Sequence, residues 1–134
     1  MTDFKRVFID TAPLIYFLEN SPLYMESMGK FFTRCIKEHI QIVTSTLTIE
    51  EYLVLPFSNG KMEYMDNFKK FIHYMNIEVV DIDSTIAEHG AKIRGQYKNF
   101  KAMDALQIAT AIVKNVICFL QMTNSFGKKK SFHV

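Results

Sequence analysis

The sequence has few residues that interrupt or cross-link a chain. Its 134 residues include two cysteines, three prolines, five glycines and no tryptophan. Cys35 and Cys118 lie far apart without a metal-ligand spacing, so we interpret them as buried thiols of a protein from a reducing compartment. No apolar run approaches the roughly 20 residues of a membrane helix, and the first residues do not resemble a signal peptide. We therefore expect a cytoplasmic protein without a membrane partner.

Other absences exclude particular kinds of site. The segment after the first predicted strand is Asp10-Thr11-Ala12-Pro13 and not a glycine-rich phosphate loop, which argues against a nucleotide-binding domain. The four histidines show no metal-ligand spacing and none lies beside a motif Ser or Cys, so we do not expect catalysis by histidine. The formal net charge of +2 is too small to indicate nucleic-acid binding by itself. If acidic residues gather in one pocket, however, the remaining surface is more basic than this total suggests.

Strand-like and helix-like segments alternate along the chain. With 49% hydrophobic residues and no linker rich in Pro, Gly or Ser, residues 1–134 are predicted to form a single domain with one core. Short β-branched and aromatic runs predict strands at 6–9, 40–43, 77–80 and 116–120. Apolar residues at helical spacing predict helices at about 11–18, 23–38, 48–55, 61–74, 83–97 and 102–114, with Pro56 closing the third. This alternation predicts an α/β fold with a parallel sheet covered on both faces.

Three acidic residues occupy positions where a parallel sheet binds its ligands, just beyond the carboxyl ends of the strands. Asp10 ends the first predicted strand, Glu51 lies in the first helical turn after the second, and Asp104 lies in the first turn of the helix before the fourth. Carboxylates held together repel one another unless a cation lies among them, and Mg²⁺ or Mn²⁺ prefers such oxygen ligands. Each residue also has a purely structural interpretation: Asp10 as a helix cap, Glu51 in a capping box with Thr48, and Asp104 as a partner of the helix dipole.

Three sequence motifs resemble those of a known nuclease family. Residues 8–12 (FIDTA), 46–53 (TLTIEEYL) and 103–111 (MDALQIATA) are similar to the three motif regions of PIN-domain nucleases, and most similar to the VapC-like toxins of prokaryotic toxin–antitoxin pairs. The resemblance extends from about Arg6 to Asn124. It implies a three-layer α/β/α sandwich with a parallel sheet of four to five strands.

The resemblance also implies a function. VapC-like PIN proteins are metal-dependent endoribonucleases, often homodimers, that a cognate antitoxin holds inactive. Carried over to this sequence, Asp10, Glu51 and Asp104 are the catalytic acids and bind Mg²⁺ or Mn²⁺, and Thr11 contributes a hydroxyl near the metal ion. The motif favours Glu51 over the adjacent Glu50, which we expect to be solvated. We therefore expect a toxin ribonuclease with RNA as its substrate and an antitoxin as its partner.

The C-terminal segment departs from the family pattern. Members of the family usually continue into Leu-Thr-Asn-Asp, whose Asp is a fourth acid, but residues 120–125 read LQMTNS, so Ser125 stands in place of that Asp and follows Asn124. With one choice of codons for residues 121–124, a single base inserted before them would restore Thr-Asn-Asp, and this hypothesis would explain an atypical, truncated end from about residue 121. Asn124 and Ser125 are then minor contributors to the site. The alternative function is a catalytically impaired PIN-like module that still dimerises or binds an antitoxin.

Basic residues just before the last motif offer a candidate surface for RNA. Arg94, Lys98 and Lys101 can contact backbone phosphates, and Tyr97 and Phe100 can stack on bases. A solvated helix face with a buried aromatic pair is an equally good interpretation of the same residues. The lysines at 128–130 are interpreted as part of a solvated, disordered terminal tail.

Overall fold

A five-stranded sheet forms the centre of the protein. The computed structural model describes residues 5–122 and 129–133. The strand order is β3-β2-β1-β4-β5, and the first four strands are parallel whereas β5 is antiparallel to β4. The strands are β1 (Arg6–Ile9), β2 (Gln41–Ser45), β3 (Glu78–Val80), β4 (Cys118–Met122) and β5 (Lys129–His133). β1 therefore lies in the middle, hydrogen-bonded to β2 on one side and β4 on the other.

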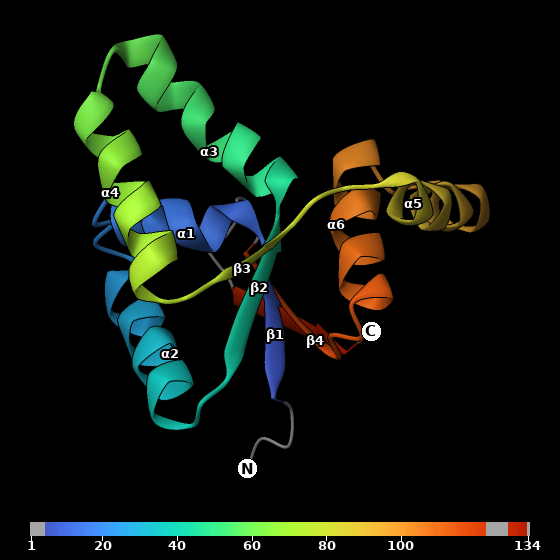
Figure 1. Cartoon of the computed structure of the whole chain (residues 1–134), viewed down its shortest axis with the longest axis horizontal. Helices are drawn as coiled ribbons and strands as arrows, with labels where there is room; N and C mark the ends of the chain where they lie inside the picture. The colour runs from blue at the N-terminus through green and yellow to red at the C-terminus, as the bar shows by residue number, and fades with distance from the viewer. Residues whose placement is uncertain (1–4, 123–128, 134) are drawn as a thin grey trace.

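Helices cover both faces of this sheet (Figure 1). One face carries α1 (Thr11–Leu18), α2 (Met25–Lys37), α3 (Thr46–Asn59) and α4 (Met62–Tyr74). The other face carries α5 (Ser84–Gln96) and α6 (Ala102–Val113). The predicted three-layer α/β/α sandwich is confirmed, with four parallel strands and one antiparallel strand at the edge.

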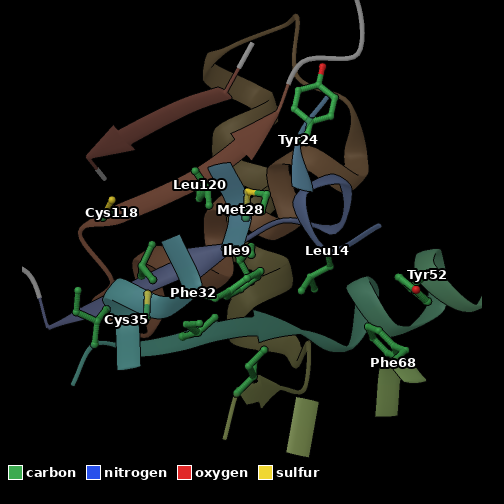
Figure 2. Packing of buried hydrophobic residues seen from close by; sticks show 14 residues of the cluster. Ile9, Leu14, Tyr24, Met28, Phe32, Cys35, Tyr52, Phe68, Cys118 and Leu120 are labelled. Atoms are coloured by element: carbon green, nitrogen blue, oxygen red, sulfur yellow. The ribbon is translucent and has the colours of Figure 1, made fainter. Parts of the chain in front are cut away.

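Alternating side chains of the central strands supply a hydrophobic cluster to each face. In β1, Val7 and Ile9 join the cluster under α1 to α4, whereas Phe8 points to the opposite cluster, which includes residues of α5 and α6. β4 follows the same period of two, and its Phe119 stacks on Phe8 with ring centroids 5.0 Å apart. Figure 2 shows the larger cluster, in which Leu120 of β4 lies among side chains of the covering helices. Burial on both faces explains why β1 is apolar at three consecutive positions.

Several helices end in a residue with positive φ that turns the chain into the next strand. His39, Asn76 and Asn115 have φ of 54°, 51° and 57°. After Asn115, the amide of Val116 still donates to the carbonyl of Ala111 at 2.8 Å, as in a Schellman motif. Val116 therefore belongs to the helix end, which explains why β4 begins at Cys118 and not at the predicted residue 116.

The prediction that Pro56 ends the third helix is wrong. α3 begins at Thr46 and continues past Pro56 to Asn59, where Gly60 caps it with φ of 67°. Proline lacks the amide that would bond to the carbonyl one turn earlier, and its ring crowds that carbonyl, but it leaves the hydrogen bonds of the residues after it intact. The carbonyl of Pro56 still accepts from the amide of Lys61 at 2.9 Å.

The C-terminal residues form more structure than the sequence indicated. Lys129 and Lys130 lie in β5, whose backbone pairs with β4, so their interpretation as a disordered tail is wrong. Residues 123–128, including Asn124 and Ser125, lie outside the described residues. Within residues 5–122 and 129–133, no helix combines the length and apolar character needed to span a bilayer.

An aromatic junction holds α1, α2 and α4 together. Phe32 of α2 is 3% exposed, and its ring lies 4.9 Å from that of Phe17 and 5.0 Å from that of Phe71, between centroids. We expect Phe32→Ala to lower the free energy of unfolding by roughly 3–5 kcal/mol, because it leaves a cavity where three helices meet. Phe57→Ala is the control, since Phe57 is 62% exposed, and we expect it to change stability by less than about 0.5 kcal/mol. Urea unfolding measures both, and similar losses in the two variants would contradict this description of the core.

The two thiols are buried, as predicted. Burial raises the pKa of Cys35 to about 11 and also raises the pKa of Cys118. Both should therefore stay protonated and react slowly with thiol reagents at pH 8 until the protein unfolds.

Because the pKa of Cys35 is higher in the folded protein, its contribution to stability is complete below pH 9 and is lost as the pH rises towards 11. Unfolding curves from pH 8 to 11 for the wild type and Cys35→Ala should converge at high pH, and parallel curves would refute this linkage.

Candidate functional site

Asp10 stands at the carboxyl end of the central strand. Its amide continues the pairing of β1 with β4 by donating to the carbonyl of Leu120 at 3.1 Å. Its side chain caps α1, because Oδ1 accepts from the amide of Thr11 at 2.8 Å. The structural interpretation of Asp10 as a cap is therefore correct, and it does not compete with a role in a site, because Asp10 also lines a pocket.

Glu51 reaches the same place from α3. Its Oε1 accepts a hydrogen bond of 2.7 Å from the hydroxyl of Thr11, which joins α3 to the first turn of α1. The capping box that pairs Glu51 with Thr48 is not formed. Ser45 caps α3, Thr48 is buried inside the helix, and Glu51 lies in the second helical turn instead of the first.

Asp104 arrives on α6, as the sequence predicted. It lies in the first turn of this helix. Because α6 leads into β4, which is parallel to β1, the helix runs back along the sheet and begins at the carboxyl edge. The structure thus brings the first turn of α6 to the edge where β1 ends and α3 begins.

The three carboxylates line one open pocket of about 920 Å³. The side chains of Ala12, Ile15 and Tyr16 form its α1 wall, while Lys101 and Met103 stand at the start of α6. The other lining residues are Asp10, Thr11, Glu51, Ala102, Asp104 and Gln107. Residues from three separate segments of the chain therefore form a single acidic pocket with a lysine at its margin.

The charges in this pocket act on one another. Burial raises the pKa of Glu51, and the neighbouring negative charges of Asp10 and Asp104 raise it further. Glu50 acts in the same direction with an effect between those of Asp10 and Asp104, while the hydrogen bond from Thr11, the largest effect after burial, lowers the pKa. Ionised carboxylates in this pocket thus repel one another, which is the situation that a bound cation relieves.

The donor atoms fit a hard divalent cation that keeps part of its water. In the part of the chain that the structure describes, no three His, Cys, Asp or Glu side chains lie together as a group that could hold a metal ion. Mg²⁺ commonly binds through one or two carboxylates and several waters, so a complete protein cage is not required. Asp10, Glu51 and Asp104 line this pocket, and such an ion would take one or two of its ligands from among their carboxylates.

The basic residues predicted to bind RNA do not all reach the pocket. Lys101 lines it, whereas Arg94 and Lys98 are exposed and are not among its lining residues. Tyr97 is 59% exposed and packs edge-on against the half-buried ring of Phe100, so the alternative of a buried aromatic pair is wrong for Tyr97. Asn124 and Ser125 cannot be placed relative to the pocket, as they fall outside residues 5–122 and 129–133.

Sequence reasoning missed Gln107 and Tyr16 as parts of the site. Gln107 is 2% exposed and donates from Nε2 to Oδ1 of Asp10 at 3.1 Å. A signal was present in the sequence, because Gln107 is a polar residue among the inward positions of α6, one turn after Asp104. Tyr16 gave no such signal, because its spacing in α1 is equally typical of a core residue.

The fold and the pocket define the class of protein: an α/β/α domain with an acidic, oxygen-donor site at the carboxyl edge of its parallel strands. The chain belongs to the PIN domain family, whose model matches residues 7–122. A comparison with curated protein sequences gives no match.

The solved structures to which this chain is similar include a toxin–antitoxin complex and two VapBC assemblies bound to DNA. A toxin–antitoxin complex from Klebsiella pneumoniae has a TM-score of 0.62 and 21% identity over 89% of this chain and 88% of the other. VapBC2 from Rickettsia felis, bound to a DNA fragment from its promoter, has a TM-score of 0.69 and 16% identity over 82% of each chain. DNA-bound VapBC from Salmonella typhimurium has a TM-score of 0.57 and 20% identity over 79% of this chain and 78% of the other. At these identities the likeness shows the fold.

The repulsion in the pocket predicts a stabilising substitution. Glu51→Gln keeps an oxygen that can accept a hydrogen bond from Thr11. It removes the negative charge of Glu51, which burial and the negative charge of Asp10 destabilise. Because the raised pKa makes the ionised form unfavourable in the folded state at neutral pH, we expect the variant to be more stable by a few tenths of a kcal/mol in EDTA. The adjacent Glu50→Gln is the control and should change stability less, since Glu50 is exposed. A loss of stability in Glu51→Gln, measured by urea unfolding, would show that the folded protein does not destabilise the negative charge of Glu51.

Proposed function

We propose that this protein is a divalent-metal-dependent endoribonuclease and the toxin of a toxin–antitoxin pair. The observation that carries the proposal is the convergence of Asp10, Glu51 and Asp104, from three separate segments, in one pocket at the carboxyl edge of a PIN fold. Members of this family are typically nucleases. The metal requirement, the RNA substrate and the residue roles are part of the proposal.

The residues of the pocket have distinct tasks in this proposal. Mg²⁺ or Mn²⁺, when bound, activates water and neutralises charge on the phosphate in an in-line displacement. Asp10 supplies an oxygen whose orientation is fixed by the Thr11 amide. Glu51, held by the hydrogen bond of 2.7 Å from the hydroxyl of Thr11, supplies a carboxylate oxygen from α3. Lys101 at the margin offers a positive charge to an RNA phosphate.

Exposed apolar residues support a protein partner. Val54, Leu55 and Phe57 near the end of α3 and Met62 at the start of α4 are each at least half exposed, between 50% and 62%. Apolar side chains gathered at one end of a helical hairpin are typical of protein interfaces. The toxin–antitoxin complexes of similar fold favour an antitoxin as this partner, and a homodimer is the second expectation.

Cleavage assays with paired variants test the enzyme. Purified protein and end-labelled RNA pools should give Mn²⁺-dependent products that EDTA prevents. Asp10→Asn and Asp104→Asn should each reduce the rate at least about 100-fold, because each removes a charged oxygen donor from the pocket. Glu50→Gln should retain activity, since Glu50 is exposed and does not line the pocket. Products that persist in the two Asn variants would come from another nuclease and would reject the proposal.

The residue at position 125 separates the two functional alternatives. If the wild type cleaves slowly because Ser125 replaces a fourth acid, Ser125→Asp should increase the rate in Mn²⁺. A catalytically impaired module predicts instead that the wild type does not cleave RNA but still forms a complex with the antitoxin encoded beside it. Size-exclusion chromatography of the co-expressed pair measures that complex.

A further inference from the structure

A buried polar side chain connects the three segments that carry the carboxylates. Gln107 of α6 is 2% exposed, yet both ends of its amide are hydrogen-bonded. Its Nε2 donates to Oδ1 of Asp10 at 3.1 Å and to Oγ1 of Thr48 at 2.8 Å, and its Oε1 accepts from the hydroxyl of Ser45. A buried polar group with this many partners is costly to disturb, because each partner loses its bond without access to water.

Asp10, Thr44, Ser45, Thr48 and Gln107 form a polar junction, and the chemistry of these groups fixes which one donates in each hydrogen bond. Thr44 must donate to the carbonyl of Ile9, 2.8 Å away, because a carbonyl can only accept. The hydroxyl of Thr48, 2.8 Å from that of Thr44, then gives its own proton to Thr44 and accepts from Gln107. An ionised Asp10 also accepts only. The amide nitrogen of Gln107 must therefore face Asp10 and Thr48, and the alternative orientation of the amide is excluded.

The junction has a regular relation to the acidic residues. Asp10 is bonded directly to Gln107. Glu51 lies three residues, about one helical turn, after Thr48 on α3, and Asp104 lies three residues before Gln107 on α6. Gln107 thus connects the end of β1, α3 and α6 through hydrogen bonds that lie one helical turn away from the carboxylates of Glu51 and Asp104.

We propose that Gln107 is a positioning residue that sets the orientation of Asp10 and the spacing of α3 and α6, and thereby the affinity of the pocket for a divalent cation. This inference rests on the proposed metal-dependent function. Two bonds to the same oxygen, from Gln107 and from the amide of Thr11, fix the plane of the Asp10 carboxylate. Partners of this kind typically change metal affinity by about 10–100-fold when they are removed.

Mn²⁺ binding to the purified protein, followed by the free-Mn²⁺ EPR signal, tests the proposal without RNA. Gln107→Met keeps the length of the side chain and removes its polar atoms, so we expect the Kd to rise about 10–100-fold. Thr110→Val is the matched control, because Thr110 is also buried on α6 but its hydroxyl donates to the carbonyl of Leu106 in its own helix. We expect its Kd to stay within about two-fold of the wild type.

A double-mutant cycle separates positioning through Asp10 from a general loss of structure. In an Asp10→Asn background, Gln107→Met should weaken Mn²⁺ binding much less than it does alone, since the group that it positions is already changed. An equal loss in both backgrounds would overturn the proposal. If Gln107→Met does not fold, Thr48→Val and Thr48→Ser replace it. Only Thr48→Ser, which keeps the hydroxyl, should retain wild-type affinity, and equal affinities in the two variants would overturn the proposal.

A crystal structure of Gln107→Met gives a readout that does not depend on metal binding. We expect the carboxylate of Asp10 to rotate or α6 to move relative to α3. An unchanged arrangement would overturn the positioning role, whatever the metal affinity. If the wild type binds no Mn²⁺ but Asp10 rotates in the variant, the proposed metal-dependent function fails and the positioning of Asp10 by Gln107 stands.

Discussion

The site depends on the parallel alignment of β1 with both of its neighbours. Because β2 and β4 run in the same direction as β1, the end of β1, the start of α3 and the start of α6 meet at one edge of the sheet. Asp10, Glu51 and Asp104 come together there although Asp104 lies far along the chain from the other two. Reversal of either strand would remove one carboxylate from the pocket.

The convergence of charges has a cost that the surrounding structure offsets. Burial and the neighbouring negative charges raise the pKa of Glu51, so the pocket opposes the ionised state of this residue. The hydrogen bond from Thr11 acts in the opposite direction on Glu51, because it stabilises the carboxylate, and Gln107 donates a hydrogen bond to Asp10. In this acidic pocket, the uncharged side chains of Thr11 and Gln107 donate hydrogen bonds to the carboxylates. Lys101 is the cation among the lining residues.

Sequence reasoning succeeded where one local pattern dominated. The apolar run of β1, the alternating strands and helices and the capping role of Asp10 all follow from short-range signals, and the structure confirms them. It failed where tertiary contacts decide. Thr48 has the sequence of a helix cap, but α3 starts earlier because Ser45 caps it, and the hydroxyl of Thr48 is instead used in the buried junction. Pro56 lies in the last turn of α3, and the helix continues past it to Asn59, where Gly60 caps it.

The sequence by itself determined the order and type of the elements from β1 to β4, the apolar faces and the three acidic residues that line the pocket, because periodicity, caps and motifs are properties of neighbouring residues. Only the tertiary structure decided that Glu51 bonds to Thr11, that Lys101 reaches the pocket while Arg94 and Lys98 do not, and that β5 adds to the sheet in the antiparallel direction. It also assigned Gln107 to the junction below the carboxylates. These relations join residues far apart in the chain, and their geometry is set by how the helices pack on the sheet and by where buried donors find acceptors.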